Sequence, residues 1–215
     1  MTMTYSEFFT KHSNEILKAF LTHIELVLIS VGIGVIIAVP LGIVLSRHKK
    51  AAKYVLMIAG VIQTIPGLVL LGAMLILMGI GKPPAIAALS LYAVLPILRN
   101  TYTGILEVDD HYIEAARGIG MSGKQMLFKV ELPLSMPSII GGLRLSTVYI
   151  ISWATLAGMI GAGGLGDMIW TGLSTYETKY ILAGAIPSAI LALVANALIG
   201  FIQRGITPKG LRMGR

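Results

Sequence analysis

Five blocks of apolar sequence, each long enough to cross a membrane, are separated by shorter polar segments along the chain. A membrane-spanning helix needs about 20 apolar residues in succession. The pattern therefore predicts an all-α integral membrane protein with about five transmembrane helices, within residues 26–46, 54–80, 83–106, 132–166 and 181–203. The fourth block is longer than one span requires, so we expect a re-entrant segment at its end. A division of residues 145–170 would instead give six spans.

The N-terminal segment, residues 1–22, is predicted to be an amphipathic helix. Charged residues interrupt it, so we expect no cleavable signal peptide. A helix lying on the membrane surface and a short helix packed on the bundle both fit this pattern. The apolar positions at rough helical spacing are Phe8, Phe9, Ile16, Leu17, Phe20 and Leu21.

Composition supports the membrane class. The 215 residues are 55% hydrophobic and 13% charged, with a mean hydropathy of +0.82. Soluble domains are about 25% charged. We expect the whole chain, 1–215, to form a single transmembrane domain. The sequence contains no cysteine, and its four histidines lack ligand spacing, so we expect no metal site.

Basic residues are concentrated in three polar segments, and the net charge is +7. With five spans these segments share one face of the membrane, and the positive-inside rule makes that face cytoplasmic. We therefore expect the N-terminus outside and the C-terminus inside, in a bacterial cell membrane. Because the charges are dispersed, the bilayer and not a nucleic acid is the expected partner. The basic residues of these three segments are Arg47, Lys49, Lys50 and Lys53, then Arg117, Lys124 and Lys129, and finally Arg204, Lys209, Arg212 and Arg215.

Residues 107–133, which we call the elbow, are polar and helix-forming although apolar blocks flank them. Asp109 and Asp110 suit a helix N-terminus, so residues 112–119 are expected to form a short helix. The glycines that follow predict a bend. On physical grounds alone, a plain connecting loop also fits.

A second short helix is expected over residues 123–130, with Ser122 as its N-cap. Pro133 is expected to end this helix and turn the chain toward the membrane. The elbow would then project into the cytoplasm, and its alanines would allow another surface to approach closely.

The spacing inside the elbow resembles the EAA loop of ABC importer permeases, whose pattern is E-A-A, three residues, G, nine residues, I, one residue, L-P. Here it reads Glu114-Ala115-Ala116, Gly120, Val130 and Leu132-Pro133, with valine in place of isoleucine. The resemblance implies the methionine-permease-like, type I importer fold over roughly residues 20–204. In that family the first short helix is a coupling helix that sits in a groove of a separate ATP-binding subunit. The interface residues it implies are Tyr112, Glu114, Ala115, Ala116, Arg117, Gly118, Gly120 and Lys124.

Three further stretches are similar to the permeases for osmoprotectants such as glycine betaine, carnitine and choline. They are residues 63–68 (Q-T-I-P-G-L), 161–167 (G-A-G-G-L-G-D) and 181–187 (I-L-A-G-A-I-P). This resemblance implies two permease chains, identical or similar, two ATP-binding subunits and a separate extracellular or periplasmic binding protein. The chain has no Walker A sequence, so we expect no enzymatic activity and no cofactor of its own, with ATP and Mg on the partner ATPase.

The alternatives are a permease for another small solute, such as an amino acid, or a stand-alone secondary transporter. A secondary transporter would be expected to carry an ionisable or unwound site at mid-membrane, and the sequence offers no paired carboxylates there.

Two segments contain candidates for the pathway or its gate. Pro66-Gly67 interrupts the second block, and Gln63 lies close to it; a packing kink is the plainer interpretation. The second segment contains Gly163, Gly164 and Asp167. It matches a dinucleotide fingerprint literally but lacks a preceding strand, so a re-entrant turn or a close helix crossing is expected.

Four aromatic residues near the span ends leave two interpretations open. They would form an aromatic belt at the membrane interface or, alternatively, a cation–π box for a quaternary amine. The belt is favoured because a separate binding protein would select the solute. The residues are Tyr149, Trp153, Trp170 and Tyr176.

Overall fold

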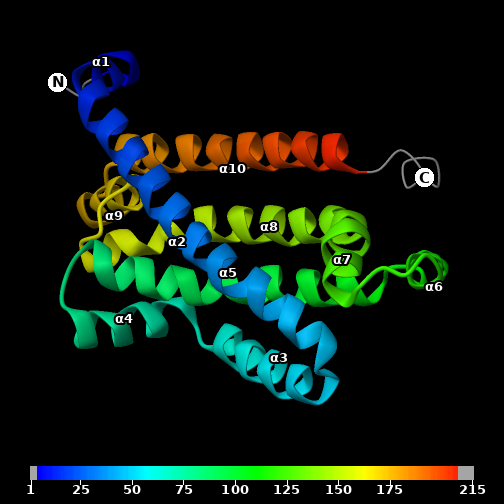
Figure 1. Cartoon of the computed structure of the whole chain (residues 1–215). Coiled ribbons are helices and arrows are strands. Elements are labelled where there is room, and N and C mark those ends of the chain that lie inside the picture. Colours follow the sequence, from blue (N-terminus) through cyan, green and yellow to red (C-terminus); the bar gives the residue numbers. More distant parts are fainter. Residues whose placement is uncertain (1–3, 208–215) are drawn as a thin grey trace.

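The computed structural model describes residues 4–207, and within these residues the chain is helical without a strand. Figure 1 shows long helices running side by side, with short helices at both ends. The elements are α1 (Tyr5–Lys11), α2 (Ser13–Arg47), α3 (Lys49–Thr64), α4 (Gly67–Met78), α5 (Lys82–Leu106), α6 (Asp110–Gly118), α7 (Gly123–Met126), the π-helical turn η1 (Leu127–Glu131), α8 (Leu132–Ala154), the 3₁₀ turn η2 (Leu156–Ile160), α9 (Leu165–Thr175) and α10 (Thr178–Ile206).

Four helices are long and apolar enough to cross a membrane: α2, α5, the continuous helix Gly123–Ala154, and α10. The pair α3 and α4 gives a fifth span if it is counted as one, and it is bent by 94°. The all-α class and the five expected spans are confirmed on this count. The second block breaks at Pro66-Gly67, where the sequence interrupts it.

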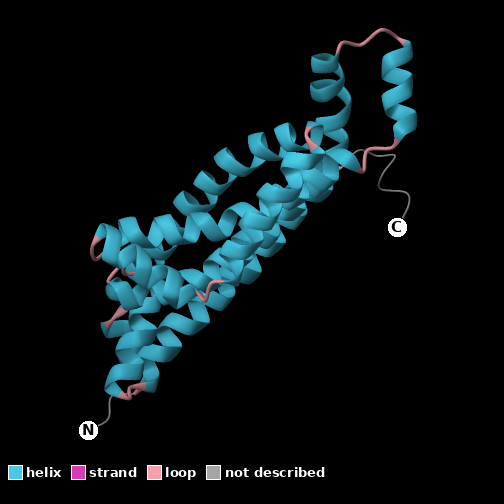
Figure 2. Ribbon diagram, turned by 90° about the horizontal axis from the view of Figure 1, so that it is seen from below, coloured by secondary structure: helices cyan, strands magenta, loops and turns pink. Residues whose placement is uncertain are grey.

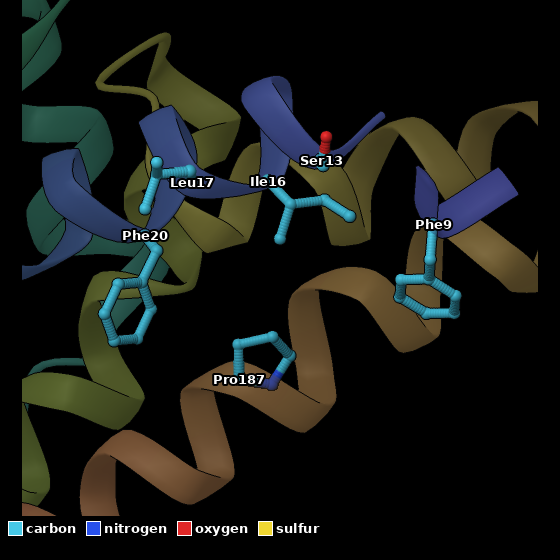
Figure 3. Close-up of a pocket in the computed structure, with 6 residues that line it drawn as sticks. All are labelled: Phe9, Ser13, Ile16, Leu17, Phe20 and Pro187. Carbon is cyan, nitrogen blue, oxygen red and sulfur yellow. The ribbon is translucent and has the colours of Figure 1, made fainter. Parts of the chain in front are cut away.

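The N-terminal segment differs from the single amphipathic helix predicted over residues 1–22. Only α1 is a separate helix, while residues 13–22 continue directly into the first span as part of α2. Phe8 is buried against Met168 and Ala183, and its ring meets the Tyr180 ring edge-on at 4.8 Å. This packing agrees with a short helix held on the bundle. Between this segment and α10 lies a cavity of about 360 Å³, where the side chains of Ile16, Leu17 and Phe20 face Pro187 (Figure 3).

Small residues allow α2, α5 and α8 to pack closely at the centre of the bundle. A Cβ placed on Gly34 would lie 2.8 Å from the Ala93 side chain, and one on Gly142 would lie 2.6 Å from Asn100. Close approach through small residues is the usual mode of helix association in membranes. On another side of α8, the half-buried Arg144 faces α10, and its Nε donates to Asn196 Oδ1 at 2.6 Å.

The basic segments lie at one end of the bundle. Figure 1 shows the α2–α3 turn, the elbow and the end of α10 at this end, and α1, α9 and the start of α5 at the other. Because α1 and the end of α10 lie at opposite ends of the bundle, the arrangement agrees with an odd number of membrane crossings. Lys209, Arg212 and Arg215, used in the charge argument, lie outside the described residues. The orientation relative to the membrane stays a prediction.

The glycine-rich segment forms a tight turn between η2 and α9. Gly161, Gly163 and Gly164 have φ of 72°, 78° and 83°, a region that favours glycine. A Cβ on Gly158 of η2 would lie 2.5 Å from the backbone nitrogen of Asp167 in α9, so η2 and α9 cross closely.

Candidate functional site

The first half of the elbow is α6, and its start is fixed by a local cap. Asp109 is the N-cap, and its Oδ1 accepts a hydrogen bond from the backbone N–H of His111 at 2.9 Å. Asp110 adds negative charge to the first turn, where it favours the positive end of the helix dipole. The predicted helix therefore exists, with bounds of 110–118 instead of 112–119.

The bend after α6 depends on Gly120, whose φ is +78°. The backbone N–H of Met121 donates to the carbonyl of Ala116 at 3.0 Å, which closes the end of the helix. Ser122 then caps α7. Its backbone N–H donates to Gln125 Oε1 at 2.8 Å, and its Oγ accepts from the Gln125 N–H. The predicted bend and cap are confirmed.

The expected role of Pro133 is wrong. The chain does not end a helix there, because α7 passes through η1 into α8 and forms one helix of 32 residues, Gly123–Ala154. Pro133 lies in the first turn of α8, directly after the wider turn of η1. A π-type turn changes the pattern of backbone hydrogen bonds, so the missing proline N–H is tolerated there. The second arm of the elbow is thus the start of the fourth span.

The elbow stands out from the end of the bundle, as Figure 2 shows for the two short helices and the loop that joins them. Among the residues implied at a subunit interface, all are exposed except Ala116, which is buried. Two apolar residues that the sequence interpretation passed over are also exposed: Ile119 by 75% and Phe128 by 66%. In the sequence, the only signal for them was that large apolar residues occur within an otherwise polar, basic segment.

The base of the elbow is tied to the first span. Glu131, in η1, is buried and pairs with the guanidinium of Arg47 at the end of α2. A hollow of about 260 Å³ lies between the start of α6 and α8, with Tyr112 and Ser138 among its lining residues. A movement of the elbow would therefore act on α8 directly and on α2 through the ion pair.

The break in the second span is built around Tyr92 of α5. The Tyr92 hydroxyl donates to the carbonyl of Ile65, which has no partner within α3 because the helix has ended. Gln63 Nε2 donates to the Tyr92 carbonyl at 3.2 Å. Gln63 thus forms a hydrogen bond between α3 and α5 next to the kink. Tyr92 was not singled out from the sequence.

Gly67 begins α4 directly against the Trp153 ring, and a Cβ there would overlap the indole. Trp153 in turn stacks on Tyr92, with ring centroids 5.1 Å apart and planes at 20°. Pro66 is exposed beside them. The structure brings Tyr149 and Trp153 to one cavity with Gln63 and Tyr92, whereas Trp170 and Tyr176 lie on and just after α9.

The other pathway candidates lie elsewhere. Gly163 and Gly164 pack against Thr22 and His23 of α2, and Asp167 is exposed in the first turn of α9. The two sets of candidates therefore contact different helices. In the described part of the chain, no group of three acidic, histidine or cysteine side chains is arranged to hold a metal ion.

The chain belongs to the family of binding-protein-dependent transport system inner membrane components, which matches residues 30–210. It is therefore an inner membrane component of a transport system that works with a binding protein. Among curated relatives, the glycine betaine/carnitine/choline transport system permease protein OpuCB of Bacillus subtilis is 47% identical over 95% of this chain and 94% of its own length. The choline transport system permease protein OpuBB of the same organism is 48% identical over 96% and 95%.

A third relative, the osmoprotectant import permease protein OsmW of Salmonella typhimurium, is 42% identical over 88% of this chain and 91% of its own. Among solved structures, an inward-facing MetNI methionine ABC transporter matches with a TM-score of 0.82 at 23% identity, over 90% of this chain and 96% of that chain. An amino acid ABC transporter matches with a TM-score of 0.73 at 23% identity, over 95% and 99%. These structures confirm the expected importer-permease fold.

Proposed function

We propose that this chain is the permease subunit of an ATP-driven importer for osmoprotectants of the quaternary-amine type, such as glycine betaine, carnitine or choline. The observation that carries the proposal is identity of 47–48%, over nearly the full length, to two permeases named for these solutes. The stretches at residues 63–68, 161–167 and 181–187 support the same solute class.

The elbow is the proposed docking site for an ATP-binding subunit. Its shape, its exposed apolar side chains and the spacing of Glu114, Gly120 and Pro133 support this assignment. Two permease chains, identical or similar, would form one pathway, and two ATP-binding subunits would bind ATP and Mg beneath them. The binding protein would deliver solute at the opposite, outer end, where α1 and α9 lie.

Closure of the ATP-binding subunits would move the two elbows together. Because α7, η1 and α8 form one helix of 32 residues, about 48 Å long at 1.5 Å per residue, the movement would reach the far end of the span. ATP can shift the equilibrium between inward-open and outward-open forms only by its differential affinity for them. Docking at the elbow would couple that difference to the membrane spans.

Uptake measurements test this function. The permease is reconstituted in liposomes together with the ATPase and the binding protein that neighbouring genes encode. The uptake of radiolabelled choline, glycine betaine, carnitine and methionine is then compared. We expect ATP-dependent uptake of a quaternary amine, no uptake of methionine and none by the permease alone. Uptake by the permease alone, without ATP, would support a secondary transporter instead. Uptake of methionine alone would contradict the solute class.

A further inference from the structure

Aromatic rings line a cavity of about 330 Å³ at the break in the second span. Its lining residues come from three helices and are Gln63, Tyr92, Tyr149 and Trp153. None of them is charged. The volume lies at the lower end of the range of about 300–1,000 Å³ that is usual for small-molecule sites.

The rings are arranged so that two helices contribute to one wall. Tyr92 of α5 and Trp153 of α8 are stacked at 5.1 Å. Tyr149 precedes Trp153 by one turn of α8, so the two side chains lie on the same face of the helix. Tyr149 is half exposed, which leaves the cavity open on its side.

We propose that this cavity is a binding site for a quaternary ammonium group, which passes through it during transport. Such a group has a fixed positive charge and no N–H, so it cannot be satisfied by hydrogen bonds. Tyrosine and tryptophan faces attract it through their ring quadrupole instead. No carboxylate is present to bind the cation tightly, which suits a site that must release its ligand. The inference rests on the proposed function for its solute class.

The same residues that line the cavity also hold the bend of the second span. The Tyr92 hydroxyl is bound to the carbonyl of Ile65, and Gly67 lies against the Trp153 ring. At its other end, the helix that carries Trp153 forms the second arm of the elbow. A ligand in this cavity would therefore contact residues on the helix that continues into the elbow.

Fluorescence of the full-length permease tests the site directly. The chain has two tryptophans, so Trp170→Phe leaves Trp153 as its only indole. The protein is purified in maltoside detergent without choline lipids and titrated with choline. We expect a saturable change in Trp153 emission, and none with 3,3-dimethylbutan-1-ol, the uncharged isostere. A response to phosphatidylcholine but not to choline would overturn the proposal in favour of a lipid site.

Substitutions at Tyr149 show whether choline is bound by attraction to the aromatic ring or only by packing against the side chain. Tyr149→Leu should weaken choline binding about fivefold or more, and Tyr149→Phe should stay within about twofold. Tyr54→Leu, an exposed tyrosine of α3 outside the cavity, is the matched control. Size-exclusion elution and the thermal unfolding curve show whether each variant is folded. Equal binding by the leucine and phenylalanine variants would contradict the assignment.

Uptake by the assembled importer distinguishes the two proposals. If the importer takes up choline while Trp153 shows no response, the cavity assignment is wrong and the proposed function stands. If no quaternary amine is taken up, the proposed function itself fails, whatever the fluorescence shows.

Discussion

Arg47, at the end of α2, donates to the buried carboxylate of Glu131 at the base of the elbow. The Glu131 side chain is almost completely buried, whereas that of Arg47 is about half exposed. The pair joins the first span to the helix that carries the elbow into the fourth span. It is a contact through which the elbow holds more than one helix in position.

Removal of the arginine should destabilise this junction. Arg47→Ala leaves the Glu131 carboxylate buried without its partner, at a cost of about 1–3 kcal/mol. Glu131→Gln is the milder change because the amide is neutral. Thermal unfolding of the purified permease should show a clearly larger loss for the alanine variant. Identical melting curves for both variants and the unchanged protein would contradict a structural role for the pair.

The contact between Gly67 and Trp153 makes a second prediction. Gly67→Ala places a methyl group inside the indole ring, and overpacking of this kind costs about 1–3 kcal/mol. Gly60→Ala is the matched control, because a Cβ at this helical position meets nothing within 4 Å. We expect a lower melting temperature for the first variant and an unchanged or slightly higher one for the second.

Backbone conformation at the elbow gives a third prediction. Gly120→Ala meets no neighbouring atom, so its cost comes only from the positive φ and is about 1 kcal/mol. Hydrogen exchange of the α6 amides should become about fivefold faster. Gly118→Ala, at a helical position with equal space, should leave exchange unchanged or slow it. Equal rates for the two variants would show that the turn does not require glycine.

Local rules recovered the elbow well because caps and turns depend on neighbouring residues. Asp109, Gly120 and Ser122 act within four residues of their partners. The proline rule failed at Pro133, because the π-helical turn before it lets the helix continue. The broken second span followed from Pro66-Gly67, but its 94° bend did not.

Contacts between distant residues could not be predicted. The pairing of Arg47 with Glu131 and the stacking of Tyr92 on Trp153 join residues from different helices. Their geometry follows from how the helices pack, and a single sequence carries no periodic signal for it. For the same reason, the sequence alone could not separate Tyr149 and Trp153 from the other two aromatic residues near the span ends. Only Tyr149 and Trp153 line the cavity, whereas Trp170 and Tyr176 do not.

Charge reversal at the elbow gives a fourth prediction. Glu114 is exposed on α6, so Glu114→Lys should leave the fold intact but reduce co-purification of the ATP-binding subunit and transport by at least tenfold. Glu177→Lys reverses an exposed charge at the other end of the bundle and should not change co-purification. Normal transport and normal co-purification with Glu114→Lys would show that the elbow has another role.

Photo-cross-linking in native membranes tests most directly whether the elbow is the docking site. A photoreactive phenylalanine analogue replaces Tyr112 on α6 or Tyr176 after α9; both are exposed and lie at opposite ends of the bundle. If α6 docks the ATP-binding subunit, position 112 forms an adduct with that subunit and position 176 forms none. An adduct from position 176, or none from position 112 in an importer that still transports, would contradict docking at α6.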